Sequence, residues 1–218
     1  MDTIIQILAR ELGRSEAHVE NVVRLIDEGN TIPFIARYRK ELHGAMDDTA
    51  LRTLADRLQY LRNLDKRREE VKSAIEGQGK LTEELSAAID AAATLAEVED
   101  LYRPYRQKRR TRATVAREKG LEPLAELLFA QAADGPAPEE AAGAFVDPEK
   151  GVETAEDALQ GASDIIAERI SDDADIRKRL RELVWKKGYL VSAAAAKEPE
   201  DTVYRLYYAF RSPLNRVQ

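Results

Sequence analysis

Hydrophobic residues recur at helical spacing along almost the whole chain. The pattern predicts two short amphipathic helices at the start. Gly13 would end the first helix, Ser15 is a suitable N-cap for the second, and Gly29 would end the second. The two apolar stripes consist of Ile4, Ile5, Leu8 and Leu12, and then of Val19, Val22, Val23 and Ile26.

The longest apolar stripe predicts a single long helix in the first half of the chain. Asp47 or Asp48 would cap its N-terminus, and Gly77 would end it. Its inward-facing residues would be Leu51, Leu54, Leu58, Leu61, Leu64, Val71 and Ile75. At about 1.5 Å per residue, such a helix would be roughly 40 Å long. We expect it to act as a spine for other helices, with its stripe forming core rather than a cofactor site.

Two short helices are expected after the long one. Thr82 would cap the first of them, while Thr94 and Glu97 give the Thr-x-x-Glu pattern of a capping box that opens the second. Pro104 would end that second helix. Two short helices joined by a tight turn and followed by a basic arm indicate a helix-turn-helix-like unit.

The second half of the chain is also predicted to be helical. A linker is expected at 134–148, where the alanines around 137–144 allow a short helix. Helices are expected at Leu121 to Phe129, Thr154 to about Ile170, Ser171 to Lys187 and Asp201 to Phe210, with a brief extended segment at Tyr189 to Ser192. We find no convincing strand pattern and no fixed repeat. The predicted fold class is therefore all-α, a multi-helix array with a long spine helix and an inserted helix-turn-helix-like unit.

Composition indicates a globular protein and narrows its chemistry. Hydrophobic residues make up 44% and charged residues 34% of the 218 positions. Cysteine is absent, which excludes disulfides, thiolate metal sites and cysteine nucleophiles. The sequence has no apolar run near the ~20 residues that span a bilayer, and no secretory signal follows Met1. These features favour the cytoplasm and predict no contact with a membrane.

Positive charge is concentrated in one stretch of a chain whose formal net charge is -6. Between Leu101 and Lys119 the only acidic residue is Glu118, and Tyr102 and Tyr105 lie among the cations. Clustered Lys and Arg with interleaved aromatic side chains are typical of surfaces that contact a phosphate backbone. The candidate nucleic-acid-binding residues are Arg103, Arg106, Lys108, Arg109, Arg110 and Arg112. The alternatives are a solvated basic loop, or arginines that pair with the acidic stretch at 135–175.

A second segment, NTIPFIARYRKELHG at Asn30 to Gly44, combines apolar and basic residues. We favour a structural interpretation, in which a short helix is anchored by its apolar end and its arginines pair with carboxylates on neighbouring helices. Direct phosphate contact by these arginines is the alternative.

The sequence offers no convincing catalytic or metal site. GQGKLT at Gly77 to Thr82 departs from a phosphate-binding loop, because a helix precedes it and Leu81 follows the lysine. The two histidines, His18 and His43, are expected at the surface. The carboxylates and serines lie in helix faces and caps without a catalytic arrangement. We therefore expect no enzymatic activity and no cofactor.

Several motifs resemble those of the bacterial Tex family of transcription accessory proteins. They are TIPFIARYRKE at Thr31 to Glu41, GKLT at Gly79 to Thr82, TLAEVEDLYRPYRQKRRTRA at Thr94 to Ala113 and AREKGLEPLA at Ala116 to Ala125. The resemblance runs in order over nearly the whole chain. Arg106 stands where the family more often has Lys, and Met46 where it often has Leu.

The resemblance implies a helical scaffold of residues 1–71 plus 131–218, with the helix-turn-helix-like unit inserted at 72–130. It also implies a longer protein with a ribonuclease-H-like domain, helix-hairpin-helix elements and a C-terminal OB-fold domain, because SPLNRVQ at Ser212 to Gln218 resembles the middle of a family motif. Such a protein would be a cytoplasmic factor acting near RNA polymerase and binding RNA or DNA with little sequence preference.

Two hypotheses follow for this region. In the first, it is a non-catalytic scaffold whose basic patch is an accessory nucleic-acid contact of weak, salt-sensitive affinity. In the second, it is a purely structural or protein-interaction scaffold, and the arginines dock onto acidic residues. Arginines exposed together on one face would favour the first hypothesis, and arginines buried against Asp or Glu would favour the second.

Overall fold

The computed structural model describes residues 3–107, 109–133, 135–195 and 202–217 of the chain. Helices predominate, as predicted, and these ranges also contain one two-stranded antiparallel sheet. No helix in them combines the length and the apolar character needed to cross a membrane. The chain forms two compact units, Met1–Val98 and Glu99–Gln218. The division into residues 1–71 plus 131–218 and an inserted 72–130 unit stays a prediction.

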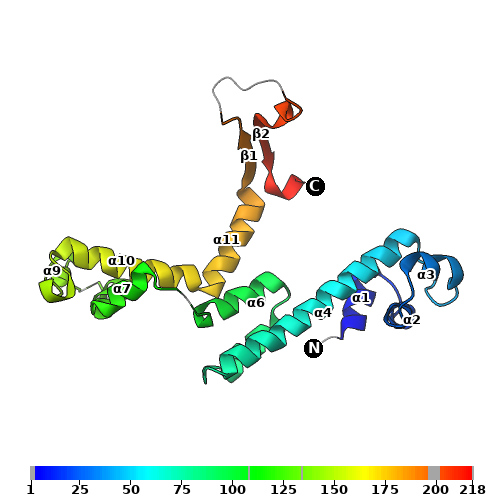
Figure 1. Ribbon diagram of the computed structural model, residues 1–218, viewed down its shortest axis with the longest axis horizontal. Helices are drawn as coiled ribbons and strands as arrows, with labels where there is room; N and C mark the ends of the chain where they lie inside the picture. The colour runs from blue at the N-terminus through cyan, green and yellow to red at the C-terminus, as the bar shows by residue number, and fades with distance from the viewer. Residues whose placement is uncertain (1–2, 108, 134, 196–201, 218) are drawn as a thin grey trace. The chain divides into compact units, whose positions relative to one another are not determined.

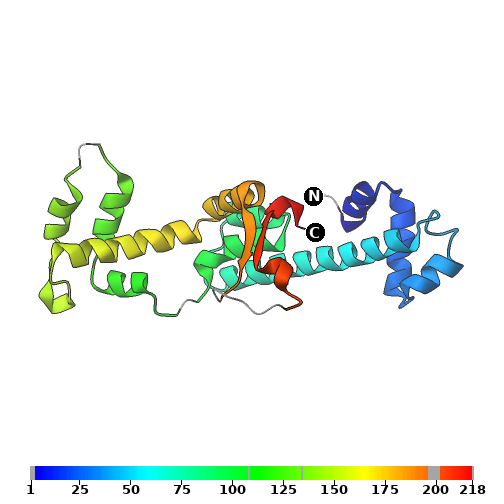
Figure 2. The same ribbon diagram turned by 90° about the horizontal axis from the view of Figure 1, so that it is seen from above.

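The first unit is built on the predicted long helix, α4. Its elements are α1 (Ile4–Leu12), α2 (Glu16–Asp27), α3 (Ile32–Tyr38), α4 (Asp48–Glu76), α5 (Glu83–Ala91) and the start of α6 (Leu95–Tyr102). The predicted caps form, since the Ser15 hydroxyl accepts from the His18 amide at 3.3 Å and the Asp47 carboxylate from the Ala50 amide at 2.7 Å. In Figure 2 the blue helices α1 to α3 lie beside the N-terminal half of cyan α4.

The core of the first unit lies where α1, α2 and α3 meet α4. It consists of Leu8, Ala9, Val19, Val22, Val23, Leu25, Ile35, Met46, Leu51, Leu54, Leu58 and Leu61. Ion pairs lie at its edges: Arg57 binds Glu11 of α1 at 2.7 and 2.8 Å, and Arg62 binds Asp27 of α2 at the same two distances. The stripe predicted from helical spacing is therefore the buried face of α4.

The capping box predicted at the start of α6 forms with a shifted partner. The Thr94 hydroxyl accepts from the Glu97 amide at 3.2 Å, as expected. The Glu97 carboxylate reaches one residue further back and accepts from the Ala93 amide at 2.7 Å. Both contacts satisfy backbone amides at the helix entrance, which is the physical role of the motif.

Helix α3 confirms one half of the structural interpretation of its segment. Its apolar end is anchored, because Ile35 is fully buried. The expected pairing of its arginines with carboxylates is wrong for the described residues. Arg37 lies 5.9 Å from the centre of the Tyr38 ring, and Arg39 lies 5.4 Å from that of Phe34. A guanidinium group is weakly hydrated, so the nearby aromatic faces of the same segment are favourable positions for it.

The prediction of two surface histidines is wrong for His43, which is 1% exposed. The chain after α3 folds back against α2, where the Asn21 amide group donates to the Leu42 carbonyl at 3.2 Å. Gly44 has a φ of +60°, and the His18 ring occupies the space that a Cβ there would need. Close packing of this turn against α2 buries His43, which the polar sequence around it did not indicate.

The second unit is built on α10. Its elements are the end of α6, η1 (Arg103–Tyr105), α7 (Arg112–Glu118), α8 (Glu122–Ala130), α9 (Pro138–Gly143), η2 (Pro148–Lys150), α10 (Ala155–Asp172), α11 (Ala174–Lys187), β1 (Tyr189–Ala193), η3 (Arg205–Tyr207), β2 (Ala209–Pro213) and η4 (Leu214–Arg216). Helices α7, α8 and α9 all contact α10, which is yellow in Figure 1. The short helix allowed within the predicted linker is α9.

Small residues dominate the core of the second unit. It contains Ala113, Ala116, Leu121, Leu124, Ala125, Ala141, Ala142, Val152, Ala158, Ala162 and Ile165. The absence of a side chain at Gly161 allows Leu121 to lie directly against α10, because a Cβ at this position would clash with the leucine. Alanines and a glycine at these positions let α7 and α8 approach α10 closely.

The C-terminal part differs from the sequence prediction in two respects. Helix α11 begins after Asp173, whose carboxylate accepts from the Ile176 amide at 2.8 Å, and Ser171 belongs to α10. The helix predicted at 201–210 is wrong. Its described part contains η3 and the start of β2, and Asp201 lies outside the described residues. β2 pairs with β1 in a hairpin, with Tyr189 opposite Pro213 and Ala193 opposite Ala209. Pairing to β1 outweighs the weak helical pattern of this segment.

Candidate nucleic-acid interface

The candidate arginines lie between α6 and the first residue of α7. Arg103 belongs to η1, Arg106 follows it directly, and Arg112 opens α7. Lys108 lies outside the described residues. The remaining five candidates line two grooves that share Thr111. Arg103, Arg106 and Arg109 border a groove of about 350 Å³, while Arg110 and Arg112 border one of about 400 Å³.

Arg103 and Arg106 are bound to carboxylates of the second unit. The Arg103 Nε donates to Asp172 Oδ1 at 2.9 Å, and the Asp172 side chain is only 14% exposed. This pair ties η1 to the last turn of α10. Arg106 pairs with Glu99 of α6 and lies 5.4 Å from the centre of the Tyr102 ring. Both side chains therefore hold the start of the basic stretch against its own unit.

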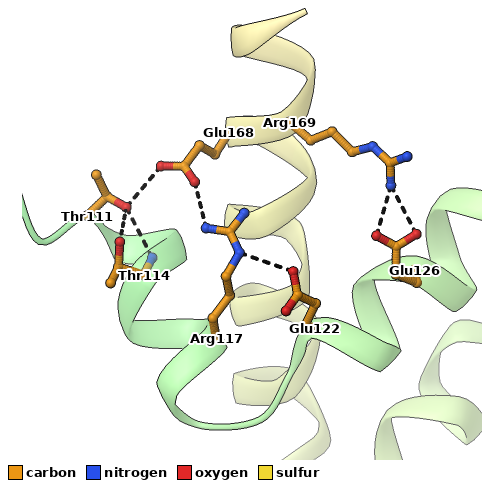
Figure 3. Close-up of polar contacts among 7 residues, drawn as sticks. All are labelled: Thr111, Thr114, Arg117, Glu122, Glu126, Glu168 and Arg169. Carbon is orange, nitrogen blue, oxygen red and sulfur yellow. Dashed lines mark hydrogen bonds and ion pairs between the residues drawn. The ribbon is translucent and has the colours of Figure 1, made fainter. Parts of the chain in front are cut away.

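Arg117 is the centre of a polar network between α7, α8 and α10 (Figure 3). It donates to Glu168 at 2.7 Å and to Glu122 at 3.3 Å. The Thr111 hydroxyl donates to the other Glu168 oxygen at 3.0 Å and accepts from the Thr114 amide as the N-cap of α7. The hydrogen bond with Glu168 raises the pKa of Arg117 above its ordinary value. The network fixes α7 on α10.

A second ion pair in the same region joins α10 to α8. One guanidinium nitrogen of Arg169 donates to both Glu126 oxygens, at 2.9 and 3.0 Å (Figure 3). The same guanidinium lies 4.1 Å from the centre of the Phe129 ring. The Phe129 ring remains 40% exposed beside this guanidinium group.

The other arginines are much more accessible. Arg110 binds Glu118 at 2.6 Å, but its side chain is 69% exposed, and Arg112 is 86% exposed and lies 3.8 Å from Asp164. Arg109 is exposed and makes no ion pair within the described ranges. Exposed ion pairs of this kind contribute about 0–1 kcal/mol. A phosphate could therefore replace these carboxylates at little cost.

The larger groove has a mixed electrostatic character. Its cationic lining consists of Arg110, Arg112 and Lys119, and its acidic lining of Asp157 and Asp164. Lys119 is held by the Gly151 carbonyl, which accepts from its Nζ at 2.6 Å. The two carboxylates belong to α10, whereas Arg110 and Arg112 lie at the N-terminal end of α7. An anion in this groove would contact the arginines and be repelled by the two carboxylates.

The structure thus divides the predicted site into two sets. The side chains of Arg103 and Arg106 are 40% and 44% exposed and bind carboxylates of their own unit, whereas Arg109 is exposed and the side chains of Arg110 and Arg112 are 69% and 86% exposed. The sequence had offered pairing with the acidic 135–175 stretch as an alternative, and Asp164 and Asp172 of that stretch are indeed partners. It did not identify Arg117 as the centre of a network. Its spacing from Glu122, five residues further along, gives no helical-pair signal.

Comparisons with known proteins find relatives of nearly the whole chain. The family model of the Tex-like protein N-terminal domain matches residues 2–76, and that of the Tex central region matches residues 134–218. "Uncharacterized protein YdcI" of Bacillus subtilis (strain 168) is 47% identical over 97% of this chain and 30% of its own length. "Transcriptional accessory protein Tex" of Neisseria gonorrhoeae is 41% identical over 98% of this chain and 28% of its own length.

A more distant human relative, "S1 RNA-binding domain-containing protein 1", is 31% identical over 89% of this chain and 19% of its own length. The chain thus spans less than a third of the length of each of these relatives. The two family models together match most of its residues, and both describe parts of one protein family. The chain belongs to the Tex family and comprises sequence of its N-terminal and central regions.

Proposed function

We propose that this chain is a non-catalytic helical scaffold of a Tex-like transcription accessory factor that binds RNA or DNA with little sequence specificity in the cytoplasm. Its basic arm, Arg109 with Arg110 and Arg112, is an accessory contact to the phosphate backbone. Most of the affinity resides in sequence that the longer relatives carry outside the matched stretch. RNA polymerase or another part of the transcription machinery is the proposed protein partner. The relatives named for transcription and for RNA binding support this proposal.

The observation that carries the arm's role is the exposure of its arginines beside one groove. The side chains of Arg110 and Arg112 are 69% and 86% exposed, compared with 40% for Arg103 and 44% for Arg106. Water screens the Arg110–Glu118 pair, and Arg112 lies 3.8 Å from Asp164, beyond hydrogen-bond distance. A phosphate backbone offers several oxygens at once, and its binding releases condensed counterions. Backbone contacts of this kind do not distinguish sequences.

A purely structural role is the second candidate, and a specific observation favours it. Arg103 and Arg117 bind Asp172 and Glu168, whose side chains are only 14% and 16% exposed. These contacts join η1 and α7 to α10 and need no ligand. If every arginine of the stretch acts in this way, the region is a scaffold without a nucleic-acid contact.

The test is a charge-reversal variant, Arg109→Glu with Arg110→Glu and Arg112→Glu, titrated with fluorescently labelled single-stranded RNA at two salt concentrations. We expect weaker binding at low salt. We also expect a shallower dependence of affinity on salt, by about 0.7 in log–log slope for each phosphate that the variant no longer neutralises. Circular dichroism should show unchanged helix content, because the three side chains are exposed.

The matched control reverses three exposed cations of the first unit, Arg14→Glu, Arg52→Glu and Lys66→Glu, and so changes the net charge equally. We expect this variant to bind RNA more tightly than the arm variant. Equal loss of RNA affinity in both variants would show that the effect depends on net charge and not on the position of the arginines. Unchanged binding by the arm variant would favour the structural role.

A further inference from the structure

The C-terminal part of the second unit exposes a large apolar surface. Helix α11 contains no buried residue, although Leu180, Leu183 and Val184 follow the spacing of an amphipathic helix. The side chains of the surface are between 40% and 88% exposed: Leu180, Leu183, Val184, Trp185, Tyr189, Leu190, Val191, Val203, Tyr204, Leu206, Tyr207 and Val217. We call this set the α11–hairpin surface. The spacing of Leu180, Leu183 and Val184 is that of a buried helix face, yet these side chains are about half exposed.

The α11–hairpin surface also contains a groove. Leu180, Val184, Trp185 and Leu214 line a groove of about 490 Å³, with Arg177 and Arg181 at its border. The guanidinium ends of these two arginines are fixed, because both bind Asp100, which is 5% exposed. The hairpin continues from the C-terminal end of α11 (Figure 1). The groove is thus formed by ordered elements that ion pairs hold in place.

Exposed apolar residues that cluster in one part of a soluble protein mark interaction sites. Scattered exposed aliphatic residues need no explanation, but these residues are concentrated on one helix and its adjoining hairpin. The first unit shows the contrast, since most of the α4 stripe is buried by its neighbours. Helix α11 contacts α10 and η4 among the described residues, but its stripe of Leu180, Leu183 and Val184 stays about half exposed.

The length of the relatives indicates what covers this surface. Nearly the whole chain matches YdcI, yet the match accounts for only 30% of YdcI. The exposed residues lie in 180–217, within the part that the Tex central region model matches, whereas the first unit has a complete core of its own. We therefore expect the polypeptide that the relatives carry beyond the matched stretch to cover this surface.

Charge further defines the partner. Between 176 and 190 the side chains around the stripe are mostly basic: Arg177, Lys178, Arg179, Arg181, Lys186 and Lys187, with Glu182 the one acid of that range. An apolar centre with a basic rim fits a partner with an apolar face and acidic margins. The aliphatic stripe of Leu180, Leu183 and Val184 gains by exclusion of water and has no ring that could stack on a base, although Trp185 and the hairpin tyrosines do. Protein fits this surface better than nucleic acid.

We propose that the α11–hairpin surface is an intramolecular docking face for the polypeptide that full-length Tex relatives carry outside the stretch matched here. That polypeptide would present an apolar surface with an acidic margin to Leu180, Val184 and Trp185. The proposal concerns protein–protein packing and is independent of the arm's contact with nucleic acid.

Trp185, the only tryptophan of the chain, provides the test. Hydroxyl-radical footprinting would compare the 218-residue chain with a hybrid in which this chain replaces the matching segment of Bacillus subtilis YdcI. The oxidation rate of Trp185 should fall several-fold in the hybrid, together with that of Leu183. Tyr38 of the first unit, 56% exposed, is the control and should keep its rate.

Unchanged oxidation of Trp185 in the hybrid would overturn the proposal. So would protection that depends on protein concentration, which indicates a second copy, or protection that requires added RNA. A photo-crosslinking residue placed in native full-length YdcI at the position aligned with Leu183 gives a second readout that does not depend on folding of the hybrid. An adduct within one chain to sequence beyond the match supports docking. Adducts only between copies, or none, contradict it.

Discussion

The roles of individual arginines in this chain follow from the geometry and burial of each ion pair. Arg103 and Arg117 bind carboxylates that have lost most of their water, so removing the guanidinium would leave a poorly solvated charge. Arg112 lies 3.8 Å from Asp164, and its own side chain, like that of Arg110, remains mostly in water. The same residue type is thus structural at one position and available for binding a few residues away.

Asp27 of the first unit gives a pH prediction at the same scale. The hydrogen bond from Arg62 holds the pKa of the Asp27 carboxyl below its ordinary value. Because the pKa of this carboxyl is lower in the folded state than in the unfolded state, its ionisation stabilises the fold at pH values above the unfolded-state pKa. This stabilisation is lost as the pH falls through the folded-state pKa. Asp27→Asn should therefore cost up to about 1 kcal/mol at neutral pH, because the pair is roughly half exposed.

Urea denaturation followed by circular dichroism would measure the effect at neutral and at acidic pH. The difference between Asp27→Asn and the parent protein should shrink as the pH falls below the folded pKa of Asp27. Asp56→Asn, which removes an exposed carboxylate from α4, is the control and should change stability by less than about 0.5 kcal/mol at neutral pH. A difference for Asp27→Asn that grows on acidification would contradict the assignment.

At the scale of elements, helices were predictable where a stripe, a cap and a stop signal agree. Helix α4 has all three, and it runs from Asp48 to Glu76 between the predicted Asp47 cap and Gly77. The hairpin was not predictable in this way, because β1 and β2 are stabilised by each other across a long sequence separation. Local pattern cannot report such pairing.

Periodicity also could not tell which apolar stripes are buried. Leu54 of α4 is fully buried, whereas Leu183 of α11 is 48% exposed. We expect Leu54→Ala to cost about 2–5 kcal/mol in unfolding free energy, through lost burial and the cavity left behind. Leu183→Ala should cost less than about 1 kcal/mol in this chain, since the side chain already contacts water. Equal losses in urea denaturation would show that α11 is covered in solution.

That the candidate arginines bind nucleic acid stays a prediction, and the sequence showed only that they are clustered. Charge clustering identified the stretch that contains Arg109, Arg110 and Arg112, because clustering is visible in the sequence itself. The sequence did not show that these arginines are exposed while Arg103 and Arg106 are held by carboxylates. It depends on where α10 places its carboxylates, and on burial created by the packing of α7 and α8. Long-range contacts of that kind have no signature at the level of residue spacing.

At the scale of the whole molecule, the two units differ in what they leave exposed. The first unit has a conventional aliphatic core around α4. The second has a core of small residues, an exposed set of arginines and the α11–hairpin surface. Since the chain spans 30% or less of the length of YdcI, the gonococcal Tex protein and the human relative, both surfaces are available for further parts of such a protein or its ligands.

The proposed function divides one basic stretch into arginines that hold the second unit together and arginines that are expected to bind nucleic acid. Two double variants test the division most directly, Arg103→Met with Arg117→Met and Arg110→Met with Arg112→Met, each measured for unfolding free energy and for RNA affinity. The first should lose about 1–3 kcal/mol of stability through its unpaired carboxylates and keep its RNA affinity while folded. The second should keep its stability and lose affinity. Equal stability losses, or equal affinity losses, in the two variants would contradict the division.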